Sequence, residues 1–233
     1  MLKEIFFPTY IIPTTDSLGH KIRGTAKIYL VYLFAAISLF FLLLLLDELL
    51  INNFFNYSMI EQFIVINQKV KVKYGNYAFI FVVLLGPLIE EIFFRLPLRL
   101  EKVGIGLSVA LITYRLSVDQ LLIFEFNNIY SYGKVALALV AFLLTLRFLP
   151  DSWLAMIKKK YFYFFYFMAS AFALFHVTNF APYNQSVLLF YPIFTLPQFL
   201  MGLFIGHARM KYGFFYGVAL HSLINLPSVL FRL

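Results

Sequence analysis

Long apolar runs alternate with short polar segments along most of the chain. The first run, at 28–46, contains no charged residue. A helix needs about 20 mostly apolar residues to cross the hydrocarbon core of a bilayer. Read along the whole chain, this pattern predicts about seven spans (six to eight), at 28–46, 77–98, 104–124, 135–149, 161–178, 187–206 and 214–231. We therefore expect an all-α fold, a polytopic helical membrane protein.

The domain organisation follows from the same pattern. No internal repeat, low-complexity segment or polar linker divides the apolar part of the chain. We expect an N-terminal cytoplasmic segment at 1–27, where polar and aromatic residues mix, followed by a single transmembrane domain at 28–233.

Composition excludes the soluble alternatives. Hydrophobic residues make up 62% of the chain and charged residues 13%, against about 45–50% and about 25% in soluble domains. A soluble globule or a disordered chain does not have this composition. The chain has no cysteine, so disulfides, thiolate metal sites and a cysteine nucleophile are excluded.

The net charge of +8 fits a membrane better than a nucleic acid. Basic residues of polytopic proteins gather in cytoplasmic loops, where they face anionic lipid. Lys and Arg are more frequent in the segments that lie inside when the N-terminus is cytoplasmic. We expect that orientation, with the lipid bilayer as a partner and no nucleic acid.

Ionisable side chains within the apolar runs mark a candidate site, because charges at membrane depth are costly. Glu91 and Arg95 stand four residues apart, so they share a helix face and can form an ion pair. Glu90 is turned from that face by about 100° and is free for chemistry. Arg115 and Asp119 have the same spacing and are interpreted as a self-satisfied pair.

Two later runs carry the other candidates. His221 and Asn225 stand four residues apart and share a helix face. Phe172 stands one turn before His176, so its ring would pack beside the site. If the three helices converge, Glu90 and His176 can orient and deprotonate a water. His221 and Asn225 can then donate hydrogen bonds to the oxyanion formed on a peptide carbonyl.

The three motifs EExxxR, FxxxH and HxxxN, in this order within apolar helices, resemble those of the CAAX protease and bacteriocin-processing family (Abi, CPBP). The resemblance covers about 86–225 and includes Ser170-Ala171 before Phe172. It implies an all-helical, glutamate-dependent intramembrane endopeptidase. By the resemblance, Glu90 is the catalytic base beside His176.

The same resemblance assigns the remaining site residues. His221 and Asn225 would form the oxyanion hole, supported by Glu91, Arg95 and Phe172. No metal or other cofactor is expected, although a metal-dependent alternative would use Glu90, His176 and His221 as ligands. Substrates would be membrane-associated peptides or proteins. The basic loops and small size favour a bacterial plasma membrane, where the family is tied to bacteriocin maturation and self-immunity.

The chain departs from the family pattern in two places. Leu96 follows Arg95, where many bacterial members have Gly, and the interval from Glu90 to His176 is longer than the family's single helical hairpin. We interpret 104–149 as an inserted helical pair between the motif-bearing segments 76–103, 160–178 and 212–232. Two added crossings preserve the relative orientation of the motifs.

Other functions remain as alternatives. A non-catalytic scaffold or immunity protein could use the same polar residues to join helices. A small proton-coupled transporter is disfavoured, because the chain shows no repeat symmetry. Zinc proteases with HExxH and serine proteases with GxSG are disfavoured because both motifs are missing.

Overall fold

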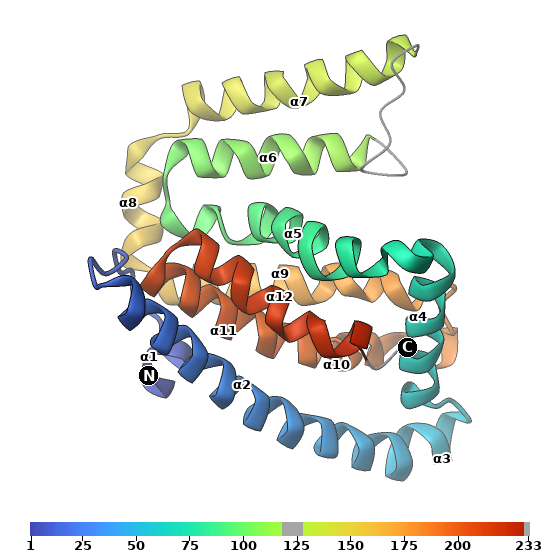
Figure 1. Cartoon of the computed structure of the whole chain (residues 1–233). Coiled ribbons are helices and arrows are strands. Elements are labelled where there is room, and N and C mark those ends of the chain that lie inside the picture. Colours follow the sequence, from blue (N-terminus) through green and yellow to red (C-terminus); the bar gives the residue numbers. More distant parts are fainter. Residues whose placement is uncertain (118–127, 231–233) are drawn as a thin grey trace.

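A computed structural model describes residues 1–117 and 128–230, and every regular element in them is helical (Figure 1). The helices are α1 (Leu2–Phe6), α2 (Leu18–Leu46), α3 (Asn53–Phe55), α4 (Met59–Tyr74), α5 (Gly86–Phe94), α6 (Lys102–Leu116), α7 (Ile129–Phe148), α8 (Asp151–Lys159), α9 (Tyr161–Phe175), α10 (Tyr191–Phe194), α11 (Leu196–Tyr212) and α12 (Phe214–Leu230). The predicted all-α fold is confirmed.

Four helical stretches of the described residues are long and apolar enough to cross a membrane: Leu18–Phe55, Ile129–Phe148, Tyr161–Phe180 and Gln185–Tyr212. A fifth is added if the bent pair Met59–Tyr77 and Ile80–Arg99 forms one span, and α12 is a shorter apolar helix. The structure thus gives four or five candidate spans, and the predicted count of seven is not shown.

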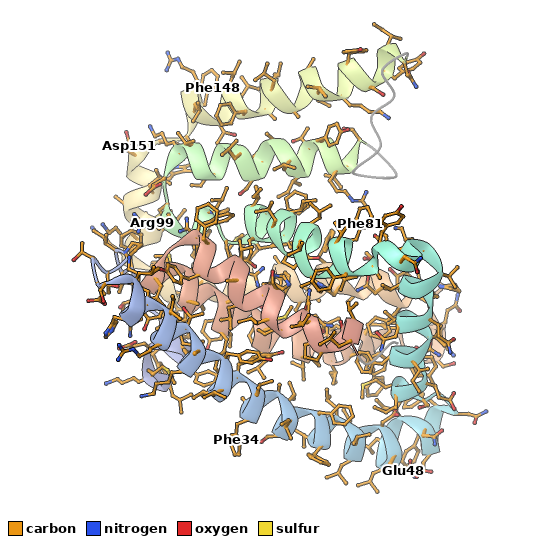
Figure 2. All side chains as sticks on the ribbon, viewed as in Figure 1. Phe34, Glu48, Phe81, Arg99, Phe148 and Asp151 are labelled. Carbon is orange, nitrogen blue, oxygen red and sulfur yellow. The ribbon has the colours of Figure 1, made fainter. Side chains whose placement is uncertain are left out.

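Apolar side chains on the outside of these helices suit a lipid environment. Phe34 of α2 is 76% exposed, and Phe148 of α7 is 68% exposed. Both side chains project away from the helical bundle (Figure 2). Exposed apolar surface on this scale is costly in water and favourable in hydrocarbon. The several long apolar helices indicate an integral membrane protein.

Helix α2 begins ten residues before the predicted start of the first span, within the segment 1–27. The side chain of Ser17 accepts a hydrogen bond from the backbone N–H of His20, which caps the first turn. Before this cap, α1 packs against α11, and Ile5 is fully buried. Part of the predicted N-terminal segment is therefore folded onto the helices.

A sharp bend precedes the helix that carries the two glutamates. Helix α4 forms between the predicted spans 28–46 and 77–98, where no helix is predicted. The helical stretch Met59–Tyr77 makes an angle of 106° with the following stretch, Ile80–Arg99. Gly75, directly after the end of α4 and just before this bend, has φ of 51°, a left-handed conformation that glycine adopts at little cost. A π-helical turn at Ile80–Leu85 then leads into α5.

Helices α6 and α7 pack against each other as a pair, and α6 lies between α7 and α5 (Figure 1). This pair lies in the region predicted as an insertion at 104–149. Arg115 has an interaction partner, whereas Asp119, its predicted partner, lies outside the described residues.

Close packing of α9 against α11 positions the chain that leads to His176. Gly202 and Gly206, four residues apart on α11, face this contact. A Cβ atom at Gly202 would lie 3.4 Å from the Cα of Ala169, and one at Gly206 would lie 2.8 Å from the ring of Phe165. Small residues with this spacing allow two helices to approach closely within a membrane.

We expect Gly202→Leu to destabilise the protein by about 1–3 kcal/mol, because the larger side chain would force the α9 backbone away. The measurement is the unfolding midpoint of the purified variant in detergent. Gly133→Leu on α7 is the matched control, since a Cβ atom there meets nothing within 4 Å. Equal midpoints for the two variants would contradict the packing argument.

Candidate active site

Three side chains from distant parts of the sequence meet inside the bundle. Glu90 comes from α5, His176 follows the last residue of α9, and His221 comes from α12. The Oε2 atom of Glu90 lies 3.8 Å from Nε2 of His176 and 3.5 Å from Nε2 of His221. The structure brings together one carboxylate and two imidazoles that the sequence singled out separately.

The two neighbouring glutamates have different surroundings, as their helical positions predict. Glu91 is fully buried, and its Oε1 atom lies 3.5 Å from Nε of Arg95 and 3.0 Å from Nδ1 of His221. Glu90 keeps 24% of its side chain exposed. Glu91 therefore holds other site residues, and Glu90 is the carboxylate that a substrate can reach.

Arg95 is buried together with its partners, with 2% of its side chain exposed. Its guanidinium carbon lies 3.8 Å from the ring centre of Phe172, a favourable cation–π contact. Within the described residues, Nη1 and Nη2 have no hydrogen-bond partner. The charge of Arg95 is thus balanced mainly by Glu91 and by the face of Phe172.

Backbone and carboxylate oxygens fix the orientation of both imidazoles. Nδ1 of His176 lies 2.8 Å from the carbonyl oxygen of Phe172, and Nδ1 of His221 lies 3.0 Å from Glu91. Because a carbonyl and an ionised carboxylate only accept hydrogen bonds, each Nδ1 carries the proton and donates it. In the neutral state, both Nε2 atoms therefore present a lone pair towards Glu90.

The site opens into a cavity of about 440 Å³. Its lining includes Glu90, His176, His221 and Asn225. It also includes polar residues that were not predicted to belong to the site, namely Asn67, Asn179, Gln198 and Ser228. Asn179 lies one short helical turn after His176, and Gln198 follows Pro197 in a predicted span. Gln198 could have been predicted as a site residue, because it is a polar residue within an apolar run.

Asn225 is tied to the backbone next to the site. Its Nδ2 atom donates a 3.0 Å hydrogen bond to the carbonyl oxygen of Val82. In the π-helical turn before α5, the N–H of Gly86 donates to Phe81, and the next residue, Pro87, has no N–H. Val82 is therefore left without this backbone donor, and the Asn225 amide replaces it.

We expect Asn225→Leu to destabilise the protein by about 1 kcal/mol, because the half-buried carbonyl of Val82 would lose its donor. Unfolding in detergent measures the loss, with Ser222→Ala on the same helix as control. Adding Pro87→Ala to Asn225→Leu supplies a backbone N–H, so partial recovery is expected. If the double variant is no more stable than Asn225→Leu, this hydrogen-bond account is wrong.

The metal-dependent alternative has limited geometric support. Two imidazoles and a carboxylate are suitable zinc ligands. Across 1–117 and 128–230, however, no three His, Cys, Asp or Glu side chains are placed so that they could hold a metal ion. The residues do not fit a metal in this arrangement.

No protein-family model matches the chain, and no curated protein or solved structure matches it. The fold and the site define an all-α protein with several helices able to cross a membrane and a carboxylate–imidazole cluster inside the helical bundle.

Proposed function

We propose that the protein is an intramembrane endopeptidase of the glutamate type, similar to the CAAX protease and bacteriocin-processing family. The observation that carries the proposal is the approach of Glu90 to the Nε2 atoms of both His176 and His221, at 3.8 and 3.5 Å, on the wall of a cavity with both polar and apolar lining. A carboxylate beside two oriented imidazoles can remove a proton from water and stabilise charge.

The proposed reaction begins with a water held between Glu90 and His176. Glu90 takes a proton from this water while the water oxygen attacks the carbon of the peptide carbonyl. This attack forms a C–O bond and a tetrahedral oxyanion. Collapse of the intermediate breaks the C–N bond, and the proton on Glu90 passes to the leaving amine. The products are a carboxylic acid and an amine.

His221 supports the oxyanion in this scheme. Since its Nδ1–H is directed at Glu91, Nε2 can donate only in the imidazolium form. The carboxylate of Glu91, 3.0 Å away, stabilises that charge. Asn225 uses one N–H for Val82, and its second N–H is available to a substrate.

The proposed activity requires that the site lies within a membrane. Seven spans, with the N-terminus on the cytoplasmic side of a bacterial plasma membrane, would bury the site within the bilayer. Its substrates would be membrane-associated peptides or proteins, and peptide maturation or self-immunity are fitting roles.

The test is cleavage of a quenched fluorescent peptide library by the purified protein, with and without a chelator. Cleavage that resists the chelator and disappears in Glu90→Gln supports the glutamate mechanism. Cleavage that the chelator abolishes would contradict this mechanism and favour the metal-dependent alternative, in which Glu90, His176 and His221 would have to move to become ligands. If no peptide is cleaved, or if the variant cleaves equally well, a scaffold or immunity role is favoured.

A further inference from the structure

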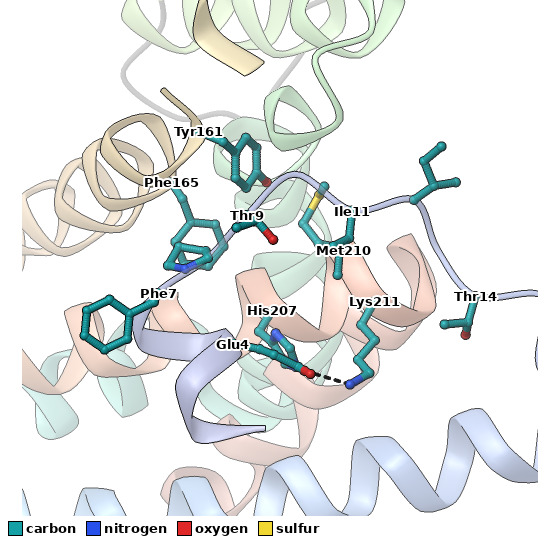
Figure 3. A pocket seen from close by; sticks show the side chains of 12 residues that line it. Glu4, Phe7, Thr9, Ile11, Thr14, Tyr161, Phe165, His207, Met210 and Lys211 are labelled. Atoms are coloured by element: carbon teal, nitrogen blue, oxygen red, sulfur yellow. Dashed lines mark hydrogen bonds and ion pairs between the residues drawn. The ribbon is translucent and has the colours of Figure 1, made fainter. Parts of the chain in front are cut away.

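A second cavity, of about 360 Å³, lies under the N-terminal segment of the chain (Figure 3). We call residues 1–14 the strap. The cavity is enclosed by the strap, by the start of α9 and by the end of α11, and it shares no lining residue with the cavity at Glu90. It is therefore a separate candidate site.

The strap is held in place by specific contacts with the helices. Ile5 is fully buried, and the hydroxyl of Tyr10 donates a 3.0 Å hydrogen bond to the carbonyl of Arg99. The hydroxyl of Tyr166 donates to the carbonyl of Phe6, and the N–H of Thr14 donates to the carbonyl of Lys211. These contacts hold the strap against the helices, where it forms one side of the cavity.

Polar groups that are able to donate hydrogen bonds gather around this cavity. Tyr161 and His207 line it and are each only 3% exposed. Within the residues that the structure describes, the Tyr161 hydroxyl, Nε2 of His207 and Oγ1 of Thr14 have no hydrogen-bond partner. Lys211 adds a charged donor to the same lining. Buried polar groups need partners, and a ligand rich in acceptor oxygens would provide them for these three atoms while also accepting from Lys211.

An internal carboxylate already interacts with part of this donor set. Oε2 of Glu4 lies 2.8 Å from Nζ of Lys211 and 3.6 Å from Nε2 of His207, and Figure 3 shows the contact with Lys211. The hydrogen bond from Lys211 holds the pKa of the Glu4 carboxyl below its usual value. Glu4 remains 54% exposed, so its side chain can turn outward and leave Lys211 to another anion.

The cavity lies at the ends of two candidate spans. Tyr161 begins the span Tyr161–Phe180, and Lys211 is the penultimate residue of the span Gln185–Tyr212. Three further lysines, Lys158, Lys159 and Lys160, directly precede this start of α9. Span ends lie at the level of the lipid headgroups, and basic clusters at that level attract anionic lipids. The cavity also has apolar lining, including Phe165 and Met210.

We propose that the cavity under the strap binds the phosphate of an anionic group, supplied by a lipid headgroup, through Lys211, His207, Tyr161 and Thr14. Glu4 is the internal competitor that the phosphate displaces. A phosphodiester offers several acceptor oxygens to converging donors, and the apolar lining accommodates the glycerol and the first carbons of the acyl chains. This proposal does not depend on peptide cleavage.

The test measures the binding of short-chain phosphatidylglycerol to the purified full-length protein in neutral detergent, by native mass spectrometry. Lys211→Met is expected to weaken binding about tenfold, because a charge-assisted hydrogen bond is lost. Tyr161→Phe, which removes only a hydroxyl, should weaken it about threefold. Glu4→Gln should strengthen it about two- to fivefold by removing the competing carboxylate.

Matched controls separate this site from general attraction to basic residues. Lys159→Met removes a nearby lysine that does not line the cavity, so it should lose only the general attraction of the basic cluster and weaken binding less than about twofold. A diacylglycerol without phosphate should not bind. If inorganic phosphate follows the same order of variants while phosphatidylglycerol does not bind, the phosphate comes from a soluble source. If Lys211→Met and Lys159→Met weaken lipid binding equally, or Glu4→Gln leaves it unchanged, the proposal is overturned.

Discussion

Glu90→Gln is expected to lower the rate of peptide hydrolysis by about 10²–10⁴-fold, the usual contribution of a general base. Glutamine keeps the size of the side chain and its ability to form hydrogen bonds, but it cannot take a proton from water. The measurement is the initial rate with the peptide that the wild-type protein cleaves fastest. Because Glu90 is partly exposed to the cavity, the exchange should leave the unfolding midpoint nearly unchanged.

Glu61→Gln on α4 is the matched control for this variant, because Glu61 is an exposed carboxylate that does not line the cavity. Its rate should equal that of the wild-type protein. If the Glu90→Gln variant retains more than about a tenth of the wild-type rate, Glu90 is not the catalytic base. That result would favour a structural role for the cluster.

Arg95→Met is expected to have the largest effect on stability, a loss of about 3–5 kcal/mol in the free energy of unfolding. The variant leaves the carboxylate of Glu91 fully buried without its arginine partner, and an uncompensated buried charge is costly. Met fills much of the same volume, so the loss reports mainly the missing charge. Reversible unfolding in mixed micelles measures it.

A second variant and a control distinguish charge from packing. Adding Glu91→Gln to Arg95→Met removes the unpaired charge, so a substantial part of the lost stability should return. Arg147→Met is the control, since Arg147 also lies over an aromatic ring, that of Phe148, but is exposed. Arg147→Met should lower the free energy of unfolding by less than about 1 kcal/mol. A similar loss for both arginine variants would contradict the buried ion-pair argument.

Local sequence determined the features that depend on near neighbours. Runs of apolar residues predicted an all-α membrane protein, because the length and composition of a run decide whether it can cross a bilayer as a helix. The spacing of Glu91 and Arg95 predicted their contact and the separate environment of Glu90, since residues four apart share a helix face. The apolar runs also predicted about seven spans, whereas residues 1–117 and 128–230 contain four or five candidates. Run length does not reveal where a helix breaks.

Tertiary structure decided what depends on residues far apart in the chain. The hydrogen bond from His221 to Glu91 and the one from Asn225 to Val82 join different helices, and helical periodicity contains no information about such pairs. The folding of the strap over His207 and Lys211 is equally non-local. The sequence by itself determined the kind of helices and the candidate chemistry. Only the packing of those helices decided which donors and acceptors meet, because buried polar groups are satisfied by whichever partners the fold brings within reach.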